Sequence, residues 1–582
     1  MPSTGASRGM LVDNKAILAR LHRLWQKNFY PIVLWIIVLG ILLVISACHQ
    51  YRRSMERSLA VRKDKENEEE EETLNGDAHP DRRTSSVQCF LRMLLSEWNI
   101  LMYRRTIPMW WNYRMTIAEM LFCSGYLVVL LVLGLVDSNG LQYKAYANRC
   151  GHLATSQIPL IIGLAGKNNV ISYLPGIGSE KLNVLHRAAG RSALVLALLH
   201  AYGRWQNGLK GHNAINTPRI IWGLVALSSF TLLTLMSVRP LRNKAYELFL
   251  ATHIVLVFTF VLAVSYHRSK SYPYVLVGWV LWAVDRLGRC LRVGILNRLW
   301  LNFNPFWRNP ASTATVELLS ADTMRISMRR HMRWKPGQYA YLIMPTISFL
   351  VWESHPFTIA SVSDTNGRQE NELTFIVRAR DGFTKRLLAH AQRGRKRQLA
   401  VECAMEGPYG CPPSLAHFST AVLISGGSGV SYTLPQFKSI IHDVRNGRSA
   451  TRSVCFIWVV RHADHISWIS TALASILATA PEFINISIRI FVTQDSDSAD
   501  QRPSKPLPSF PIMSIAPGRP DLRMLLVDEI ERAAGEVSVN VCGPPSMTQT
   551  VRTILAEGPV AGPVAIRRGC PPVELHVETF SW

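Results

Sequence analysis

Two pairs of histidines with the same spacing most constrain the fold of this chain. His186 and His200 lie in one apolar stretch and His253 and His267 in another, and 14 residues separate the members of each pair. At about 100° per residue, both histidines of a pair fall on one helix face, about 21 Å apart along the axis. A histidine at membrane depth is costly unless it faces the bundle interior and has a partner. Because imidazole is an axial ligand of haem iron, the pattern predicts two haems held by these four metal ligands.

A single histidine in an apolar helix is more often a buried side chain than a ligand, but two pairs at one spacing rarely arise by chance. The two helices, expected at 184–204 and 245–267, are separated by one further span and therefore run in the same direction. This direction pairs His186 with His253 and His200 with His267.

Long apolar segments predict a multi-pass membrane protein that also has a soluble part. Of the 582 residues, 48% are hydrophobic, which leaves room for several polar domains. Seven spans are expected, at 31–48, 116–136, 153–174, 184–204, 219–237, 245–267 and 274–293. Polar residues at 167–169 interrupt the third, which is typical of a re-entrant or bundle-shielded segment.

The net charge of +24 is better explained by orientation of the chain in the membrane than by binding to nucleic acid. Arginines follow the first span and cluster at the membrane edge, and we find no zinc-finger or RNA-binding signature. The positive-inside rule places residues 49–115 and the C-terminal half in the cytosol, although the basic N-terminal tail argues the other way. The ten cysteines are scattered, and their spacing indicates neither a metal site nor a disulfide framework.

The second half of the chain changes to short β-branched and aromatic runs separated by Gly and Pro. Strands of a small antiparallel barrel are predicted at 313–319, 323–329, 338–344, 372–380 and 398–404. After residue 418 strands alternate with helices, which predicts an α/β sheet of mostly parallel strands. The expected fold is a multi-span helical membrane domain followed by these two domains.

A glycine-rich turn lies between the first strand of the α/β region and a predicted helix. Glycines let the backbone approach a dinucleotide phosphate, and the helix N-terminus supplies a favourable dipole. Such a turn alone is a weak signal, but its position at the first strand strengthens it. The candidate nucleotide-binding residues here are Gly426, Gly427, Ser428 and Gly429.

Several motifs together resemble the fungal ferric reductase and NADPH oxidase superfamily, whose cytosolic half is similar to ferredoxin reductase. The segment His355-Pro356-Phe357-Thr358 looks like its flavin-binding signature, and the segment from Pro336 to Tyr339 looks like its barrel segment beside the flavin. The segment Cys542-Gly543-Pro544 looks like its nicotinamide segment. In the membrane region, Gln157-Ile158-Pro159, Lys167-Asn168-Asn169 and His186-Arg187 look like its haem domain pattern. The resemblance covers roughly residues 116–582.

The resemblance implies cofactor residues for FAD, two b-type haems and NADPH. The FAD candidates are Tyr339, His355, Pro356, Phe357, Thr358 and Ser361, together with Gly382 and Thr384, which stand at a helix start that favours a phosphate. Arg461 and Arg519 are candidates for the 2′-phosphate of NADPH, and each is equally compatible with a plain surface position. The implied residues beside the nicotinamide are Cys542, Gly543 and Pro544. Catalytic roles are implied for Cys542, which positions nicotinamide, and for Trp582, whose ring would cover the flavin until nicotinamide displaces it.

The resemblance also implies a domain organisation, with the first histidine pair nearer the cytosol and the flavin. The expected parts are an N-terminal tail (1–30), a first transmembrane span (31–48), a charged cytosolic linker (49–115), a ferric-reductase-like transmembrane haem domain (116–293), an FAD-binding barrel (300–412) and an NADP-binding α/β domain (418–582).

This order predicts a transmembrane metalloreductase that moves electrons from NADPH through FAD and two haems to extracytosolic ferric chelates or cupric ions. The expected location is the plasma membrane, in contact with lipid, and the expected partner is an iron permease and ferroxidase system. Two alternatives remain open. One is a superoxide-generating NADPH oxidase on the same scaffold, although the sequence has no calcium-binding loop of the EF-hand type. The other is a membrane scaffold without enzymatic activity, in which the cofactor motifs are relics.

Overall fold

The computed structural model divides the chain into two compact units, which are described separately. One comprises Met1–Tyr51 and Ile107–Gly288, and the other comprises Arg52–Thr106 and Arg289–Trp582. The expected flavin-covering residue Trp582, the acidic run of the linker and most of the N-terminal tail lie outside the described residues. The structure describes residues 29–48, 50–51, 86–109, 113–135, 143–168, 178–211, 214–297, 313–348, 350–351, 353–363, 370–393, 398–494 and 512–579.

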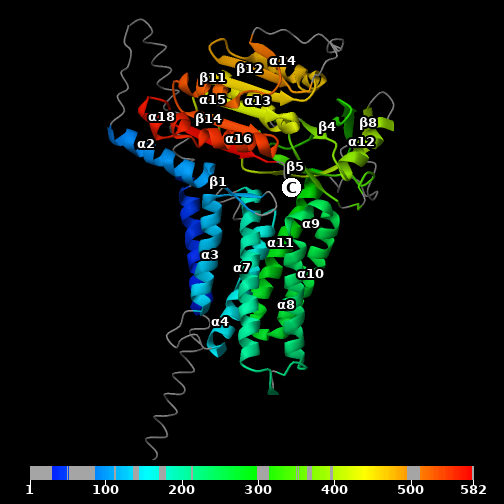
Figure 1. Cartoon of the computed structure of the whole chain (residues 1–582). Helices are drawn as coiled ribbons and strands as arrows, with labels where there is room; N and C mark the ends of the chain where they lie inside the picture. Colours follow the sequence, from blue (N-terminus) through cyan, green and yellow to red (C-terminus); the bar gives the residue numbers. More distant parts are fainter. Residues whose placement is uncertain are drawn as a thin grey trace, which may run out of the picture. The chain divides into compact units, whose positions relative to one another are not determined.

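Helices build the first unit (Figure 1). They are Phe29–Cys48, α3 (Ile117–Leu135), α4 (Tyr143–Ser156), α5 (Ile158–Ala165), α7 (Ser179–Gln206), α8 (Pro218–Met236), α9 (Arg239–Lys244), α10 (Tyr246–His267) and α11 (Tyr272–Leu296), the last of which continues into the second unit.

Among the described residues, four helices are long and apolar enough to cross a membrane, namely Phe29–Cys48, α3, α8 and α10. Helices α7 and α11 are longer, with 28 and 25 residues, but they contain more charged side chains. At about 1.5 Å per residue, each still exceeds the thickness of the hydrocarbon layer.

The segment expected at 153–174, either as a span or as a re-entrant segment, is not a single helix in its described part, residues 153–168. The structure breaks this segment into α4 and α5 at Gln157, and α5 begins with Ile158 and Pro159. Proline has no backbone N–H and cannot continue the hydrogen bonds of a preceding helix, so a new helix starts there instead. The break separates two short helices, each of which contacts α7.

Two helix pairs form the packed centre of the membrane unit. Helix α8 packs along α10, where the rings of Phe230 and Phe260 lie 4.5 Å apart. Helix α4 packs along α7, where Leu153 and Leu196 are fully buried. The helices that carry the histidine pairs are therefore held by separate neighbours.

The first domain of the second unit consists of antiparallel strands in two small sheets, as expected. One sheet has the order β7-β4-β3-β8, and the other has the order β6-β5-β9. Their core is made of apolar side chains such as Val316, Leu342 and Phe375. The strands are β3 (Thr313–Leu318), β4 (Thr323–Arg330), β5 (Tyr339–Ile343), β6 (His355–Thr358), β7 (Asn371–Arg378), β8 (Gln398–Glu402) and β9 (Ala404–Tyr409), with α12 (Phe383–Arg393) following β7.

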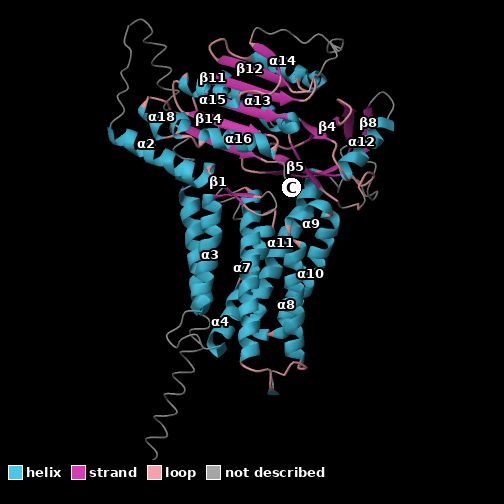
Figure 2. Cartoon of the chain, in the orientation of Figure 1, coloured by secondary structure: helices cyan, strands magenta, loops and turns pink. Residues whose placement is uncertain are grey.

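The second domain is a parallel sheet in the order β13-β12-β11-β10-β14-β15, with helices packed beside it (Figure 2). The connections change direction at β10, so the carboxyl ends of β10 and β14 mark the switch point at which such sheets bind ligands. Its elements are β10 (Thr420–Gly426), α13 (Val430–Arg445), β11 (Ser453–Val460), α14 (Ser470–Thr479), β12 (Asn485–Val492), β13 (Met513–Pro517), α15 (Leu522–Glu531), β14 (Val537–Cys542), α16 (Pro545–Leu555), α17 (Gly558–Ala561), α18 (Pro563–Arg567) and β15 (Val573–Glu578).

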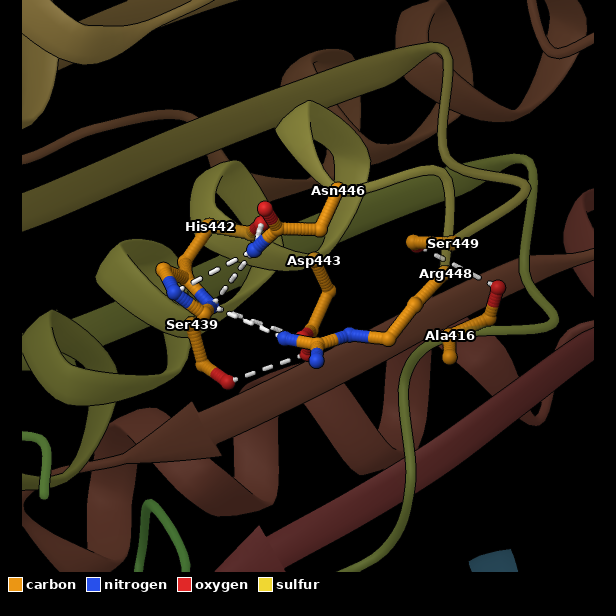
Figure 3. A network of polar contacts seen from close by, with 7 residues as sticks. All are labelled: Ala416, Ser439, His442, Asp443, Asn446, Arg448 and Ser449. Atoms are coloured by element: carbon orange, nitrogen blue, oxygen red, sulfur yellow. Dashed lines mark hydrogen bonds and ion pairs between the residues drawn. The ribbon is translucent and has the colours of Figure 1, made fainter. Parts of the chain in front are cut away.

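A polar network closes the end of α13 that is remote from the glycine-rich turn (Figure 3). The Asn446 amide group donates to the backbone carbonyl of His442 at 2.8 Å, and Arg448 donates to Asp443 at 3.0 Å. These side chains are exposed or only partly buried, and they satisfy one another. The network therefore terminates a helix and is not a site.

A segment that precedes α3 in the sequence packs on the nucleotide-type domain. We call residues 86–104 the docking segment, which consists of α2 (Ser86–Asn99) and a π-helical turn (Ile100–Arg104). Arg104 is 4% exposed and donates to the carbonyls of Leu555 at 2.6 Å, Ala561 at 3.3 Å and Val573. These carbonyls end α16 and α17 and begin β15, so one guanidinium ties three elements together.

Candidate functional site

The structure brings the four histidines together in the two predicted pairs. The ring centres of His186 on α7 and His253 on α10 lie 6.4 Å apart, and those of His200 and His267 lie 6.1 Å apart. Within the described ranges, no three His, Cys, Asp or Glu side chains gather as a metal site. Each pair is thus a two-ligand arrangement from facing helices.

Every one of these rings is fixed through its Nδ1 atom. His186 donates to the Ile161 carbonyl at 2.8 Å, and His200 donates to the Ala147 carbonyl at 2.6 Å. His267 donates in the same way to the carbonyl of Arg219 at 2.7 Å, and His253 lies 3.3 Å from the hydroxyl of Ser237. Since a carbonyl can only accept, the proton sits on Nδ1 and the lone pair on Nε2 in His186, His200 and His267, which is the tautomer of a metal-binding imidazole.

Two glycines leave the space that the outer rings occupy. A Cβ atom at Gly151 would lie 2.7 Å from Nδ1 of His200, and one at Gly223 would lie 2.6 Å from Nδ1 of His267. No real side chain approaches this closely, so each ring position requires a glycine on the neighbouring helix. These glycines were not predicted, because nothing in the sequence pairs them with a histidine.

The residues fit a haem in each pair. Imidazole nitrogens bind metal ions at about 2 Å, so two nitrogens on opposite sides of one ion are about 4 Å apart. Ring centres lie further out than the nitrogens, which agrees with the separations of 6.4 and 6.1 Å. With two protein ligands per ion, the remaining positions suit a porphyrin.

A buried acid of the membrane unit was also not predicted. Asp285 of α11 is 6% exposed, accepts the backbone N–H of Asn168 at 2.9 Å and pairs with Arg286 at 2.6 Å. Ionisable groups in membrane segments are costly and mark functional positions. Here the acid holds the chain that leaves α5.

The flavin-type segment forms β6, and its histidine is oriented by neighbours. The ring of His355 stacks on Phe383 with centres 4.1 Å apart, and its Nε2 lies 2.8 Å from a carboxylate oxygen of Glu353. Strand β6 pairs with β5, which sets Thr358 directly opposite Tyr339 and Pro356 opposite Tyr341. The predicted segments 336–339 and 355–358 are therefore adjacent.

An aromatic and charged cluster adjoins this segment. The rings of Tyr339, Tyr341 and Tyr409 lie 5.7 to 6.0 Å from one another. Tyr409 donates to the carboxylate of Glu406 at 2.6 Å, and that carboxylate also receives two bonds from Arg289, at 2.6 and 2.8 Å. Burial is the main cause that raises the pKa of Tyr409, and the negative charge of Glu406 raises it further. Tyr339 and Tyr409 are buried, so the cluster forms an aromatic support next to the predicted flavin segment.

Two predicted flavin hydroxyls have other partners in the structure. Ser361 donates to the carbonyl of Glu372 at 2.9 Å and accepts the N–H of Thr374 at 3.1 Å. Thr384 accepts the N–H of Arg380 at 2.9 Å at the start of α12, next to Gly382, whose φ is +63°. The Thr384 hydroxyl stabilises the turn before α12, as short polar side chains commonly do, whereas the Ser361 hydroxyl ties its segment to the backbone of β7. The backbone around Gly382 stays available to a phosphate.

The glycine-rich turn and the segment after β14 meet at the switch point of the sheet. Strand β10 pairs with β14, with Ser425 beside Cys542. A Cβ atom at Gly429 would lie 2.2 Å from the Cys542 carbonyl, so only glycine fits there. The indole N–H of Trp458 donates to the Gly427 carbonyl at 3.0 Å and fixes the turn. Gly426, Ser428, Gly543 and Pro544 complete the two facing segments.

The two candidate arginines stand at the same edge of the sheet as this turn. Arg461 follows the carboxyl end of β11, and Arg519 follows that of β13. Both are exposed, and parallel strands place their carboxyl ends at one edge. They can therefore face a nucleotide bound at the turn.

This fold and these sites define a class of membrane proteins in which a helical domain is joined to a ferredoxin-reductase-like FAD and nucleotide module. Three family models match the chain in this order, namely "Ferric reductase like transmembrane component" at residues 150–264, "FAD-binding domain" at 308–413 and "Ferric reductase NAD binding domain" at 418–556. The predicted resemblance to ferric reductases and the expected fold class are thus confirmed.

Fungal proteins are similar to this chain over much of its length. A probable cell surface ferric reductase of Aspergillus oryzae is 32% identical over 55% of this chain and 44% of its own length. A probable ferric reductase transmembrane component of Candida albicans is 26% identical over 70% and 61%, and ferric/cupric reductase transmembrane component 2 of Saccharomyces cerevisiae is 27% identical over 81% and 68%. The chain thus spans about half the length of the first two relatives.

Similarity to solved structures is lower. A ferredoxin reductase in carbazole 1,9a-dioxygenase is 18% identical over 46% of this chain and 69% of that one, with a TM-score of 0.31.

Proposed function

We propose that this chain is a transmembrane metalloreductase that takes electrons from cytosolic NADPH and delivers them to ferric chelates across the membrane, with cupric ions as a second acceptor. The main support for this proposal is the arrangement of the four histidines in two facing pairs, whose ring centres lie 6.4 and 6.1 Å apart. A hydrogen-bond partner holds the Nδ1 atom of each ring. Relatives named ferric/cupric reductases support the metal acceptor. A relative named a cell surface ferric reductase supports the plasma membrane, where an iron permease and ferroxidase system would be the partner.

Flavin divides an electron pair, and haem irons carry single electrons between cofactors. The contribution of the protein would be to hold these cofactors in position. His186 and His253 would hold one haem and His200 and His267 the other, and a haem held by two histidines would supply electron transfer to an outside acceptor rather than oxygen binding. In the second unit, Glu353 orients His355 on β6, the strand paired with β5, which would help to hold the flavin. The facing segments at Gly429 and Cys542 would leave a close backbone approach for the nucleotide.

The test uses membranes that contain the full-length protein. We expect a low-spin b-type haem spectrum and NADPH-dependent reduction of Fe(III) chelate. His200→Ala and His267→Ala should remove half of the haem and abolish chelate reduction, while flavin stays bound and NADPH still reduces it. The matched control is His390→Ala, because His390 is exposed on α12 and should leave chelate reduction unchanged.

Two results would contradict the proposal. Protein without Soret absorbance, despite adequate haem supply, would remove the electron path. Superoxide release without chelate, together with no chelate reduction, would instead identify the oxidase alternative.

A further inference from the structure

Three arginines surround the second histidine pair, His200 and His267. Arg204 follows His200 by one helical turn at the end of α7. Arg219 lies in the first turn of α8, and its carbonyl receives the Nδ1 hydrogen bond of His267 at 2.7 Å. Arg268 directly follows His267. Three different helix ends therefore each carry an arginine whose backbone is close to a histidine of this pair.

The positive charge of these arginines has no acidic counterpart in their surroundings. The sequence contains no Asp or Glu between 198 and 222 or between 260 and 276. In the part of the chain that the structure describes, neither Arg204, Arg219 nor Arg268 forms an ion pair. Burial is the main cause that lowers the pKa of Arg268, and the positive charges of Arg219 and Arg204 lower it further. The three arginines are therefore close enough for their charges to interact.

The membrane side of this cluster is unusual for basic residues. In the chain, helix α11 (Tyr272–Leu296) follows Arg268 and precedes the strands that begin at Thr313. In the proposed function this helix crosses the membrane once, which puts Arg268 and those strands on opposite sides. If the strands are cytosolic, as the proposed function requires, the arginines are extracytosolic. Short loops on that side are normally poor in Arg and Lys, so topology does not explain them.

We propose that Arg204, Arg219 and Arg268 form a carboxylate-binding site beside the outer histidine pair. The planar guanidinium fork matches a carboxylate with two parallel hydrogen bonds, and three such groups would neutralise a polycarboxylate. Two sources supply this chemistry here, namely the carboxylates of a ferric polycarboxylate chelate and the carboxylate groups of a porphyrin held by the histidines. The assignment of an electron acceptor rests on the proposed function, whereas the carboxylate chemistry rests on the arginines alone.

The inner pair offers a contrast within the same unit. Arg187 donates to the hydroxyl of Tyr113 at 3.3 Å, and the guanidinium carbons of Arg187 and Arg239 lie 5.6 and 5.7 Å from the centre of that ring. These inner arginines are thus partly satisfied by an aromatic partner. Among the described residues, no ring takes this position at Arg204, Arg219 or Arg268, which leaves their forks open to a ligand.

The experiment compares Arg204→Gln, Arg219→Gln, Arg268→Gln and the triple variant with Lys270→Gln in membranes. Lys270 is exposed and close in sequence to Arg268, so its substitution removes the same charge from the same membrane face. Three quantities are measured for each variant: haem content, KM for the anion Fe(III)–EDTA and KM for the cation hexaammineruthenium(III). Ionic strength is varied, since screening weakens exposed charge interactions.

If the chelate is the ligand, the triple variant keeps both haems and its KM for Fe(III)–EDTA rises roughly tenfold, while the KM for the cation stays level or falls. If the porphyrin is the ligand, the same variants lose or shift the outer haem spectrum, and Lys270→Gln does not. Unchanged haem content together with an unchanged KM for Fe(III)–EDTA would overturn the site. Wild-type protein that reduces neither acceptor would refute the proposed function instead, and the haem readout would still decide the carboxylate chemistry.

Discussion

The positions of the His200 and His267 rings require glycine at residues 151 and 223, because a Cβ atom there would overlap the rings. We expect Gly151→Ala to displace His200 and Gly223→Ala to displace His267, because the added carbon would lie 2.7 and 2.6 Å from Nδ1. Each variant should lose up to half of the total haem and shift the spectrum of what remains. Pyridine haemochrome content of purified full-length protein measures this.

The control for both glycines is Gly190→Ala on α7. Nothing lies within 4 Å of a Cβ at that position, so haem content should be unchanged. Equal haem in all three variants would show that the rings can move aside without cost.

A buried histidine makes the nucleotide-type domain sensitive to acid. His465 is 6% exposed and stacks on Trp468 with ring centres 4.2 Å apart. Burial lowers its pKa; the nearby Asp322 raises it by less, and His462 and Arg378 lower it further. The unfolded chain then binds the proton more readily, so stability is lost as pH falls below about 6.5 toward the lower folded-state pKa.

The expected result is a larger fall in Tm between pH 7.5 and 5.5 for the wild type than for His465→Phe, which keeps the stacking and cannot take up a proton. Thermal unfolding of the full-length protein followed by flavin release measures both. The same pH dependence in the two proteins would rule out this histidine as the cause.

At the scale of elements, the docking segment stabilises the domain on which it packs. Arg104→Ala would leave the carbonyls of Leu555, Ala561 and Val573 without their donor, at a cost of about 3 kcal/mol or more. We expect a lower Tm and faster hydrogen exchange at residues 555–573. Arg105→Ala is the matched control, because the neighbouring Arg105 is exposed. An equal Tm for the two variants would mean that the segment adds no stability.

The sequence predicted elements whose pattern is local and missed those that depend on tertiary contacts. The pairing of His186 with His253 followed from the helical period and chain direction alone. The break at Gln157 was missed because apolar composition continues across it, although Pro159 was its signal. The flavin roles of Ser361 and Thr384 stay predictions from motif position, while the backbone hydrogen bonds of their hydroxyls depend on tertiary contacts and were not predicted.

At the scale of the whole molecule, nucleotide preference is expected to come from the edge of the parallel sheet. Arg461→Gln and Arg519→Gln remove two cations from the edge of the sheet that carries the glycine-rich turn, so the KM for NADPH should rise about tenfold while the KM for NADH stays constant. Flavin reduction rates with both nucleotides measure this. Arg568→Gln is the control, because it precedes β15 at the other edge. A parallel change for both nucleotides would exclude a 2′-phosphate contact.

The contacts of Arg104 also constrain how the protein is made. Arg104 and Leu555 are 451 residues apart in the chain. At ribosomal speeds of 5 to 20 residues per second, Arg104 emerges about 20 to 90 s before its acceptors exist. During that interval the membrane helices are inserted, and the docking segment has no acceptor carbonyls to bind. Assembly of the nucleotide-type domain is therefore completed only after translation of its last strand, and a chain truncated before β15 would expose an unprotected surface to cellular quality control.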